Sequence, residues 1–355
     1  MIRVGEDTQV TNLREIVKVD TIHFQLKLVV YIVVTASLIS LALFLPVPYW
    51  ILPSLLLGLA YAHAVELQHQ CLHSTAYRSK FWGRAVGVLL GLPSLVSFSD
   101  YQNSHLRHHR LLGTPEDKEF FNYAYKKLNS FPALIKHLWM VRHYRDVMGY
   151  IFKSAVGKLV RKDEATPKMA KRIRFEYQLM AVFIAAMAFV TIYFQTTLFL
   201  KLWLIPLLVA VPTHALIELP EHIGCNTTIN DVLVNTRTIK TNKLVVWFVN
   251  GNNYHVEHHW LPAVPNDKFP ELHTLVSSRI TYADISYRSF YSQFFRNLRK
   301  NNLHQAWEPA TINFQLIKTA VSEPAPAIEP ALTGVSEANE APEKTLSAKS
   351  SSASA

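Results

Sequence analysis

Four long apolar stretches, arranged in two pairs, stand out in the pattern of hydrophobic and polar positions along this chain. They cover residues 28–45, 50–67, 177–194 and 198–219. At a rise of 1.5 Å per residue, an α-helix of about 20 residues crosses the roughly 30 Å hydrocarbon layer of a bilayer. We therefore expect four transmembrane helices in an all-α membrane protein.

A short connection joins the two members of each pair. Residues 46–49 and 195–197 leave room only for a tight reversal, so the four helices should form two hairpins. Neither turn contains Lys or Arg, whereas residues 73–176 are rich in both. Because cytoplasmic loops carry such an excess of positive charge, we expect that segment and both termini to lie in the cytoplasm.

The composition divides the chain into three parts. Residues 1–27 mix charged and polar side chains without a signal-peptide cleavage site, and we expect a cytoplasmic N-terminal segment. Residues 28–308 should form one membrane domain. From residue 321 the chain runs mainly through Ser, Glu, Pro and Ala, so residues 309–355 are expected to be a disordered tail.

Two segments between the second and third spans should lie at the membrane surface. Residues 85–98 are apolar but too short to span, and Gly91 and Pro93 interrupt them. Residues 131–161 interleave aromatic and basic side chains, as helices that lie on anionic lipid do. The net charge of +10 also suits nucleic acid, but the adjacent spans favour lipid and we expect no nucleic-acid partner. The positive face could instead receive an acidic electron carrier.

Histidines cluster at three points beside the spans, all on the side expected to be cytoplasmic. His69 and His73 prolong the second span with the pattern HxxxH, and two HxxHH patterns follow. Residues spaced i, i+3 and i+4 lie on one face of a helix and can converge on an ion. The members of the two later clusters are His105, His108, His109, His255, His258 and His259.

The number of donors indicates more than one metal ion. Eight imidazoles exceed the three or four protein ligands of a zinc site, and two ions would use them. Imidazole suits iron, zinc, copper and nickel. The presence of only two cysteines argues against an iron–sulfur cluster, and we expect iron bound by imidazole. A zinc protease would place Glu directly after the first His, whereas Glu257 is third in its cluster. His222, at the end of the fourth span, is a ninth candidate donor.

Other polar residues near the spans have several interpretations. We expect Glu66, Glu218 and Glu257 to support the imidazoles by fixing their tautomers. His63 and His214 lie deeper in the spans and would serve as supporting groups, a proton path, haem ligands or polar groups of the bundle interior. A metal transporter or haem carrier would carry its donors inside the spans, whereas the nine candidate donors lie beside them.

The three clusters, in this order and placement, resemble the histidine boxes of the membrane fatty acid desaturase superfamily. The similarity covers roughly residues 25–280, and the superfamily also contains lipid hydroxylases and carotenoid ketolases and hydroxylases. The region around His222 and residues 235–238 resembles a bacterial subgroup that includes a desaturase of a modified amino acid. The resemblance implies a four-helix stem and a cytoplasmic helical cap that holds two irons, at a bacterial inner membrane.

The resemblance also implies a division of the histidines between two irons. His69, His109, His255 and His259 would bind one iron, and the other would be bound by His73, His105, His108, His222 and His258. In such proteins an Asn one helical turn before the equivalent of His222 holds a water that completes one iron. Glu218 occupies that position here, so the sequence leaves open whether a carboxylate completes the iron directly or through water.

The implied activity is O2-dependent desaturation of an acyl lipid or acyl thioester. An unactivated methylene yields its hydrogen only to an oxidant stronger than any side chain, and a reduced iron pair with O2 as co-substrate supplies one. A fused cytochrome b5 is not visible, so we expect a separate electron donor. A ferredoxin suits the basic face, and a separate cytochrome b5 is the alternative. A lipid or carotenoid hydroxylase or ketolase, and a desaturase of a small non-lipid metabolite, stay open.

Overall fold

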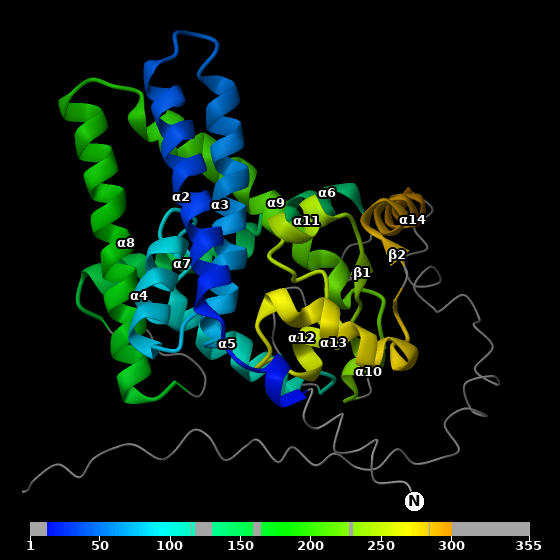
Figure 1. Cartoon of the computed structure of the whole chain (residues 1–355). Coiled ribbons are helices and arrows are strands. Elements are labelled where there is room, and N and C mark those ends of the chain that lie inside the picture. Colours follow the sequence, from blue (N-terminus) through cyan, green and yellow to red (C-terminus); the bar gives the residue numbers. More distant parts are fainter. Residues whose placement is uncertain are drawn as a thin grey trace, which may run out of the picture. The chain divides into compact units, whose positions relative to one another are not determined.

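The computed structural model describes residues 13–114, 116–117, 130–158, 165–226, 230–283 and 285–299. They form a helical assembly with one short pair of strands (Figure 1). The N-terminal segment is therefore described only from residue 13, and the tail expected at residues 309–355 lies outside the described residues.

In the part of the chain that the structure describes, four helices are long and apolar enough to cross a membrane. They are α2 (Thr21–Phe44), α3 (Ile51–Leu72), α8 (Pro167–Tyr193) and α9 (Ile205–His222), which a π-helical turn, η2 (Leu200–Leu204), precedes. Short turns connect α2 to α3 and α8 to η2. The prediction of an all-α membrane protein with four spanning helices in two hairpins is confirmed.

The helices extend further on the histidine side than the apolar stretches predict. α3 continues to Leu72 instead of residue 67, α8 begins at Pro167 instead of residue 177, and α9 continues to His222. Hydrophobicity alone locates the part of a helix inside the bilayer, whereas these extensions are more polar. The added residues of α3 are buried against other helices, and the extension of α8 buries Ala170, Ile173 and Glu176. α3 and α9 thereby carry histidines directly into the cap.

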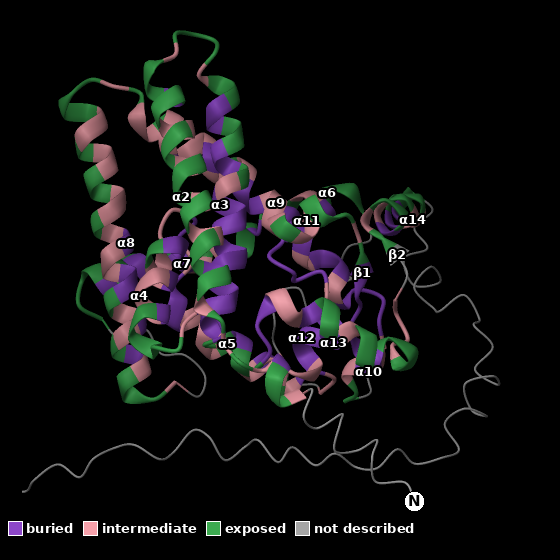
Figure 2. Ribbon diagram, viewed as in Figure 1, coloured by how far each residue is buried: buried purple, intermediate pink, exposed green. Residues whose placement is uncertain are grey.

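α3 is the central helix of the assembly. It packs against α2, α4 (Lys80–Gly91) and α9, and every residue from 61 to 72 is buried. Figure 2 shows buried positions concentrated along this part of α3, while exposed positions cover much of the outer helices. Gly58 allows the close approach of α9, because a Cβ there would lie 2.6 Å from the carbonyl oxygen of Pro206.

The segment after α3 forms a cap of shorter helices. They are α4, α5 (Phe98–Leu111), α6 (Phe131–Leu138) and α7 (Val141–Ala155). The predicted surface segment 85–98 is thus split between α4, a turn and the start of α5. α6 and α7 bury Leu134, Leu138, Val147 and Ile151 and expose apolar side chains such as Phe152, as expected of helices at a membrane surface.

The segment after α9 completes the cap. Its helices are α10 (Val232–Asn235), α11 (Lys243–Phe248), α12 (His255–Trp260), η3 (Asn266–Lys268), α13 (Phe269–Val276), η4 (Ser277–Arg279) and α14 (Tyr287–Arg299). The strands β1 (Ile239–Lys240) and β2 (Ile285–Ser286) pair in parallel, Ile239 opposite Ile285. Phe290 and Phe294 of α14 are fully buried in a cluster with Ala215 and Leu219 of α9. α14 therefore supports the histidine end of α9.

Candidate metal centre

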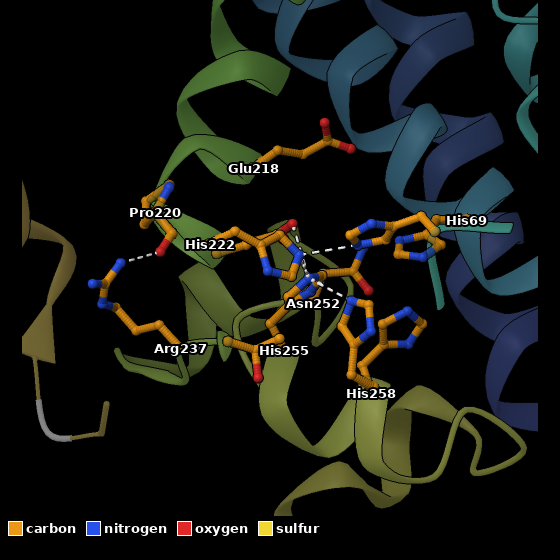
Figure 3. Close-up of polar contacts among 12 residues, drawn as sticks. His69, Glu218, Pro220, His222, Arg237, Asn252, His255 and His258 are labelled. Atoms are coloured by element: carbon orange, nitrogen blue, oxygen red, sulfur yellow. Dashed lines mark hydrogen bonds and ion pairs between the residues drawn. The ribbon is translucent and has the colours of Figure 1, made fainter. Parts of the chain in front are cut away.

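Nine imidazoles from four helices converge at the inner surface of the cap. His69 lies in the last turn of α3, His73 at its C-terminal cap, and His222 is the last residue of α9; α5 and α12 each contribute three. Figure 3 shows the rings of His69, His222, His255 and His258 directed toward one space. All nine residues proposed from the sequence are thus brought together.

Donor nitrogens form two sets of four. In each set the nitrogens lie within 4.8 Å of one another. The first set is His69, His73, His105 and His258, and the second set is His108, His222, His255 and His259. His109 lies between them, with its Nε2 2.9 Å from that of His258, and it forms a third group with His258 and His259.

These sets differ from the division that the family resemblance implies. That division places His69 with His255 and His259, whereas Nε2 of His69 lies 2.7 Å from that of His105. Likewise, Nε2 of His222 lies 2.9 Å from that of His255. Sequence order shows which residues carry imidazoles, but the side-chain directions of four helices decide which rings are neighbours.

Local structure fixes the rings of α5 and α12. The Ser97 hydroxyl caps α5 by accepting from the backbone N–H of Asp100, and the backbone and hydroxyl of Ser99 donate to the Glu176 carboxylate of α8. α12 follows a sharp turn in which Asn250 and Gly251 have φ values of 52° and 80°. Gly251 suits this left-handed conformation because it lacks a Cβ. The i, i+3, i+4 spacing then directs each trio to one side.

The second set contains nitrogens that face each other without a proton between them. Nδ1 of His222 donates to the carbonyl oxygen of Asn235 at 3.1 Å, and Nδ1 of His108 donates to the Asp117 carboxylate at 2.8 Å. In the neutral rings Nε2 then carries only a lone pair. The two Nε2 atoms lie 3.2 Å apart, an arrangement that a shared cation stabilises.

Burial keeps the cluster neutral and able to bind a cation. Burial, and after it the neighbouring imidazoles, hold the pKa well below its usual value for His105, His109, His255, His258 and His259. Burial also lowers the pKa of His73 to about 3. Metal ions bind the neutral form of imidazole, so these residues fit a metal centre without competition from protons at neutral pH.

The three carboxylates expected to support the site have other partners. Glu66 accepts from Nδ1 of His214 at 2.8 Å and from the side-chain amide of Asn252. Glu218 faces Nε2 of His214 at 3.1 Å and accepts from the hydroxyl of Tyr101. The structure thus shows His214 as a polar group between two carboxylates of the bundle, and its other expected roles stay predictions.

Glu257 supports the site from the side of α12. It accepts from the hydroxyl of Thr238 and pairs with Nδ1 of His273. These contacts tie α12 to the loop after α10 and to α13. The His63 ring, in turn, stacks on Trp247 with ring centroids 4.7 Å apart and contacts the carbonyl of Phe248, which makes it part of the helix packing.

Three groups at the centre were not identified from the sequence. Asp117 and the carbonyl of Asn235 orient His108 and His222. No pattern marks Asp117, and the resemblance at residues 235–238 assigns no role to Asn235. Glu221 has a carboxylate oxygen 3.4 Å from Nε2 of His255. Its position in the sequence, directly before the candidate donor His222, could have marked Glu221 as a candidate as well. A small pocket between the two sets is lined by His69, His105, His108, Glu218, Glu221, His222 and His255.

The comparison with known families agrees with this arrangement. The family model described as fatty acid desaturase matches residues 25–291, three quarters of the chain, and this range includes all nine imidazoles. No curated protein matches the chain.

Proposed function

This chain belongs to the fatty acid desaturase family, and from that premise we propose that it is a membrane-bound, O2-dependent di-iron enzyme that introduces a C=C bond into an acyl chain. The observation that supports this most strongly is the pair of four-imidazole sets at the ends of helices able to span a membrane. An acyl substrate in the bilayer would reach such a site without leaving the membrane.

Iron suits the donor set. The two sets and His109 supply nine imidazoles and leave the carboxylates of Glu218 and Glu221 facing the pocket between the sets. A site rich in imidazole with a carboxylate nearby is typical of non-haem iron, whereas the two cysteines of the chain, both buried, belong to neither set. When bound, the iron pair would supply the oxidising power that O2 alone lacks at a methylene carbon.

The overall reaction needs protons as well as electrons. Conversion of –CH2–CH2– and O2 into –CH=CH– and two H2O consumes two electrons, which a donor protein supplies, and two protons. Glu218, His214 and Glu66 form a continuous chain of proton-holding groups, fully buried at Glu66 and mostly buried at the other two, and Glu218 lines the pocket. In this proposal, the Glu218 carboxyl delivers a proton to the pocket. His214 then supplies a proton to the Glu218 carboxylate.

The cap excludes water from the site. His69, His105, His108, His222, His255 and His258 are each at least 95% buried. A dry site limits the loss of electrons and oxidant to solvent. It also strengthens the interaction of the imidazoles with a cation.

The electron donor is proposed to be a small acidic protein of the ferredoxin type that docks on the cytoplasmic side. Basic side chains lie at exposed positions of the cap, on α5, α6 and α7. They are Arg110, Lys136, Arg142, Arg145 and Lys153. A positive face of this kind attracts an acidic carrier and accelerates its association at low ionic strength.

Expression in a host that lacks the activity tests the proposal. Mass spectrometry of the extracted lipids should show an acyl product that has lost two hydrogens. An added oxygen atom in place of that loss would identify a hydroxylase, and a change confined to a small metabolite would identify a non-lipid substrate. The variant His258→Ala should give no product although it inserts into the membrane.

A further inference from the structure

The last turn of α9 presents an acidic side chain to the second imidazole set. The Oε2 atom of Glu221 lies 3.4 Å from Nε2 of His255, and the side chain is 13% exposed. The same residue lines the pocket with His108, His222 and His255. Glu221 therefore adds an oxygen donor beside three of the four imidazoles in this set.

A simple ion pair with His255 does not account for this contact. Nε2 of His255 lies 2.9 Å from Nε2 of His222 and 3.0 Å from Nε2 of His259, in addition to the Glu221 oxygen. A single N–H can point at only one of these atoms. A cation in their midst would satisfy all of them together.

The distances match donors that share an ion. Two donors bound at about 2.1 Å lie about 3.0 Å apart at an octahedral angle and about 3.4 Å apart at a tetrahedral angle. The contacts of His255 with His222, His259 and Glu221 fall at 2.9, 3.0 and 3.4 Å. The carboxylate oxygen thus stands at the distance of a further ligand.

The backbone that carries Glu221 is held on several sides. The backbone N–H of Arg237 donates to the carbonyl oxygen of Glu221 at 2.9 Å, and its buried guanidinium donates to the carbonyls of Pro220 and Ile223. Figure 3 shows the guanidinium directed at Pro220. Arg237 therefore fixes the end of α9 at the residues that face the second set.

A further hydrogen bond replaces one that α9 lacks, one turn earlier in the helix. Pro220 has no N–H to offer to the carbonyl of Leu216, four residues before it. The hydroxyl of Tyr291 donates to that carbonyl in its place. The turn that carries Glu221 is therefore kept in position by α14 as well as by Arg237.

Glu218 has a different place on the same helix. One of its oxygens already receives two contacts, from the Tyr101 hydroxyl at 3.2 Å and from Nε2 of His214 at 3.1 Å. It lies one helical turn before His222 and contacts His214, which also contacts Glu66 of α3. Of the two carboxylates that line the pocket, Glu221 is the one in contact with an imidazole of the second set.

We propose that Glu221 is a carboxylate ligand of the metal ion held by His108, His222, His255 and His259. This inference rests on the proposed function, because it needs the metal centre to exist. The two ions would then differ in kind: one bound by imidazoles alone, the other by imidazoles and one carboxylate, whose negative charge offsets part of the dication charge in a buried site.

Metal binding by the purified full-length chain in detergent tests this assignment. Anaerobic titration with Fe²⁺ gives the number of ions bound, and Co²⁺ loading gives an absorption spectrum that depends on the ligands. The native protein should bind two ions. Glu221→Gln, which has the same length without the charge, should bind the second ion at least about 100-fold more weakly and change the Co²⁺ spectrum.

Two further variants separate a ligand from a space-filling residue. Glu221→Asp retains a carboxylate and should bind both ions with a shifted Co²⁺ spectrum. Glu271→Gln, the same change at an exposed position of α13, should bind both ions with the native spectrum.

The outcomes distinguish failure of this inference from failure of the proposed function. Native affinity and spectrum in Glu221→Gln would overturn the inference and leave the di-iron proposal intact. Loss of the second ion in Glu221→Asp but not in Glu221→Gln would also overturn it, since size rather than charge would then matter. A native protein that binds neither ion would refute the proposed function itself.

Discussion

Asp117 accepts a hydrogen bond from Nδ1 of His108 across 2.8 Å, and both side chains are at least 98% buried. The contact directs the Nε2 lone pair of His108 toward His222, as a metal ligand requires. A carboxylate behind a ligating imidazole also raises the basicity of the ring. Asp117 therefore acts on the metal centre through His108.

Replacement of Asp117 should weaken metal binding without disturbing the fold. Asp117→Ala should lower the affinity of the second imidazole set for Fe²⁺ by about 10–100-fold, because His108 loses both its orientation and its electrostatic support. Competition with a chelator measures this affinity. Glu116→Ala, a change at the exposed neighbouring position, is the matched control and should bind as the native protein does. Equal affinity in both variants would contradict the role of Asp117.

Glu176 should be important for stability because it joins α8 to the start of α5. Its carboxylate accepts from Arg84, from the hydroxyls of Ser97 and Ser99, and from the backbone of Ser99. Glu176→Ala would leave the buried donors of Ser97 and Ser99, and the partly exposed Arg84, without this acceptor, at a cost of about 3 kcal/mol. Thermal unfolding in detergent measures the loss.

A milder variant provides the control for Glu176. Ser99→Ala removes one hydroxyl donor and should cost about 1 kcal/mol, since the carboxylate keeps its other partners. A variant Glu176→Ala that unfolds no more readily than Ser99→Ala would show that the carboxylate does not join the two helices.

Acid should destabilise the metal-free protein. In the unfolded chain the histidines titrate near 6.5, whereas in the fold the pKa of His73 is about 3 and those of His105 and His255 lie well below 6.5. Below pH 6.5 the unfolded state therefore binds more protons than the folded state. The free energy of unfolding should be highest above that pH and fall as the pH decreases. Unfolding midpoints measured from pH 8 to pH 5 check the sign.

Bound metal should change how the free energy of unfolding depends on pH. Because protons compete with the metal for imidazole, the ions should be released as the pH falls, and the stabilisation that they provide is lost with them. Excess Fe²⁺ should move the loss to lower pH. A midpoint that rises on acidification would contradict the assignment of neutral imidazoles.

Gly58 should tolerate no side chain. A Cβ at this position of α3 would lie 2.5 Å from the Cβ of Val209 and 2.6 Å from the Pro206 oxygen. Gly58→Ala should therefore force α3 and α9 apart and destabilise the protein by about 1–3 kcal/mol. Gly83→Ala in α4, where no atom lies within 4 Å of the added carbon, should be neutral or stabilising. Equal effects of the two changes would refute the close contact.

The repeated patterns of the sequence predicted most of the architecture. Apolar stretches of span length located the four helices, and the i, i+3, i+4 spacing placed the trios of α5 and α12 on one face each. Such patterns are local, so they can be recognised in one segment without knowledge of its neighbours. His222 was found because it follows a span at the depth of His69.

Contacts between distant segments could not be predicted in this way. Asp117 reaches His108 from a loop, and Asn235 supports His222 through its backbone, which has no residue signature. The division of nine rings into two sets depends on the directions of four helices relative to one another. The two-residue strand pair is likewise too short to leave an alternating pattern in the sequence.

The hydrogen bond from the Tyr291 hydroxyl to the carbonyl oxygen of Leu216 has a consequence for biosynthesis. The ribosome makes the fourth span long before it makes α14, and Arg237 and α12 also emerge after that span. While they are absent, the end of α9 has neither its substitute for the missing Pro220 N–H nor its partners for His222. Insertion into the membrane can thus precede assembly of the centre, whose nine imidazoles are complete only once α12 has been translated.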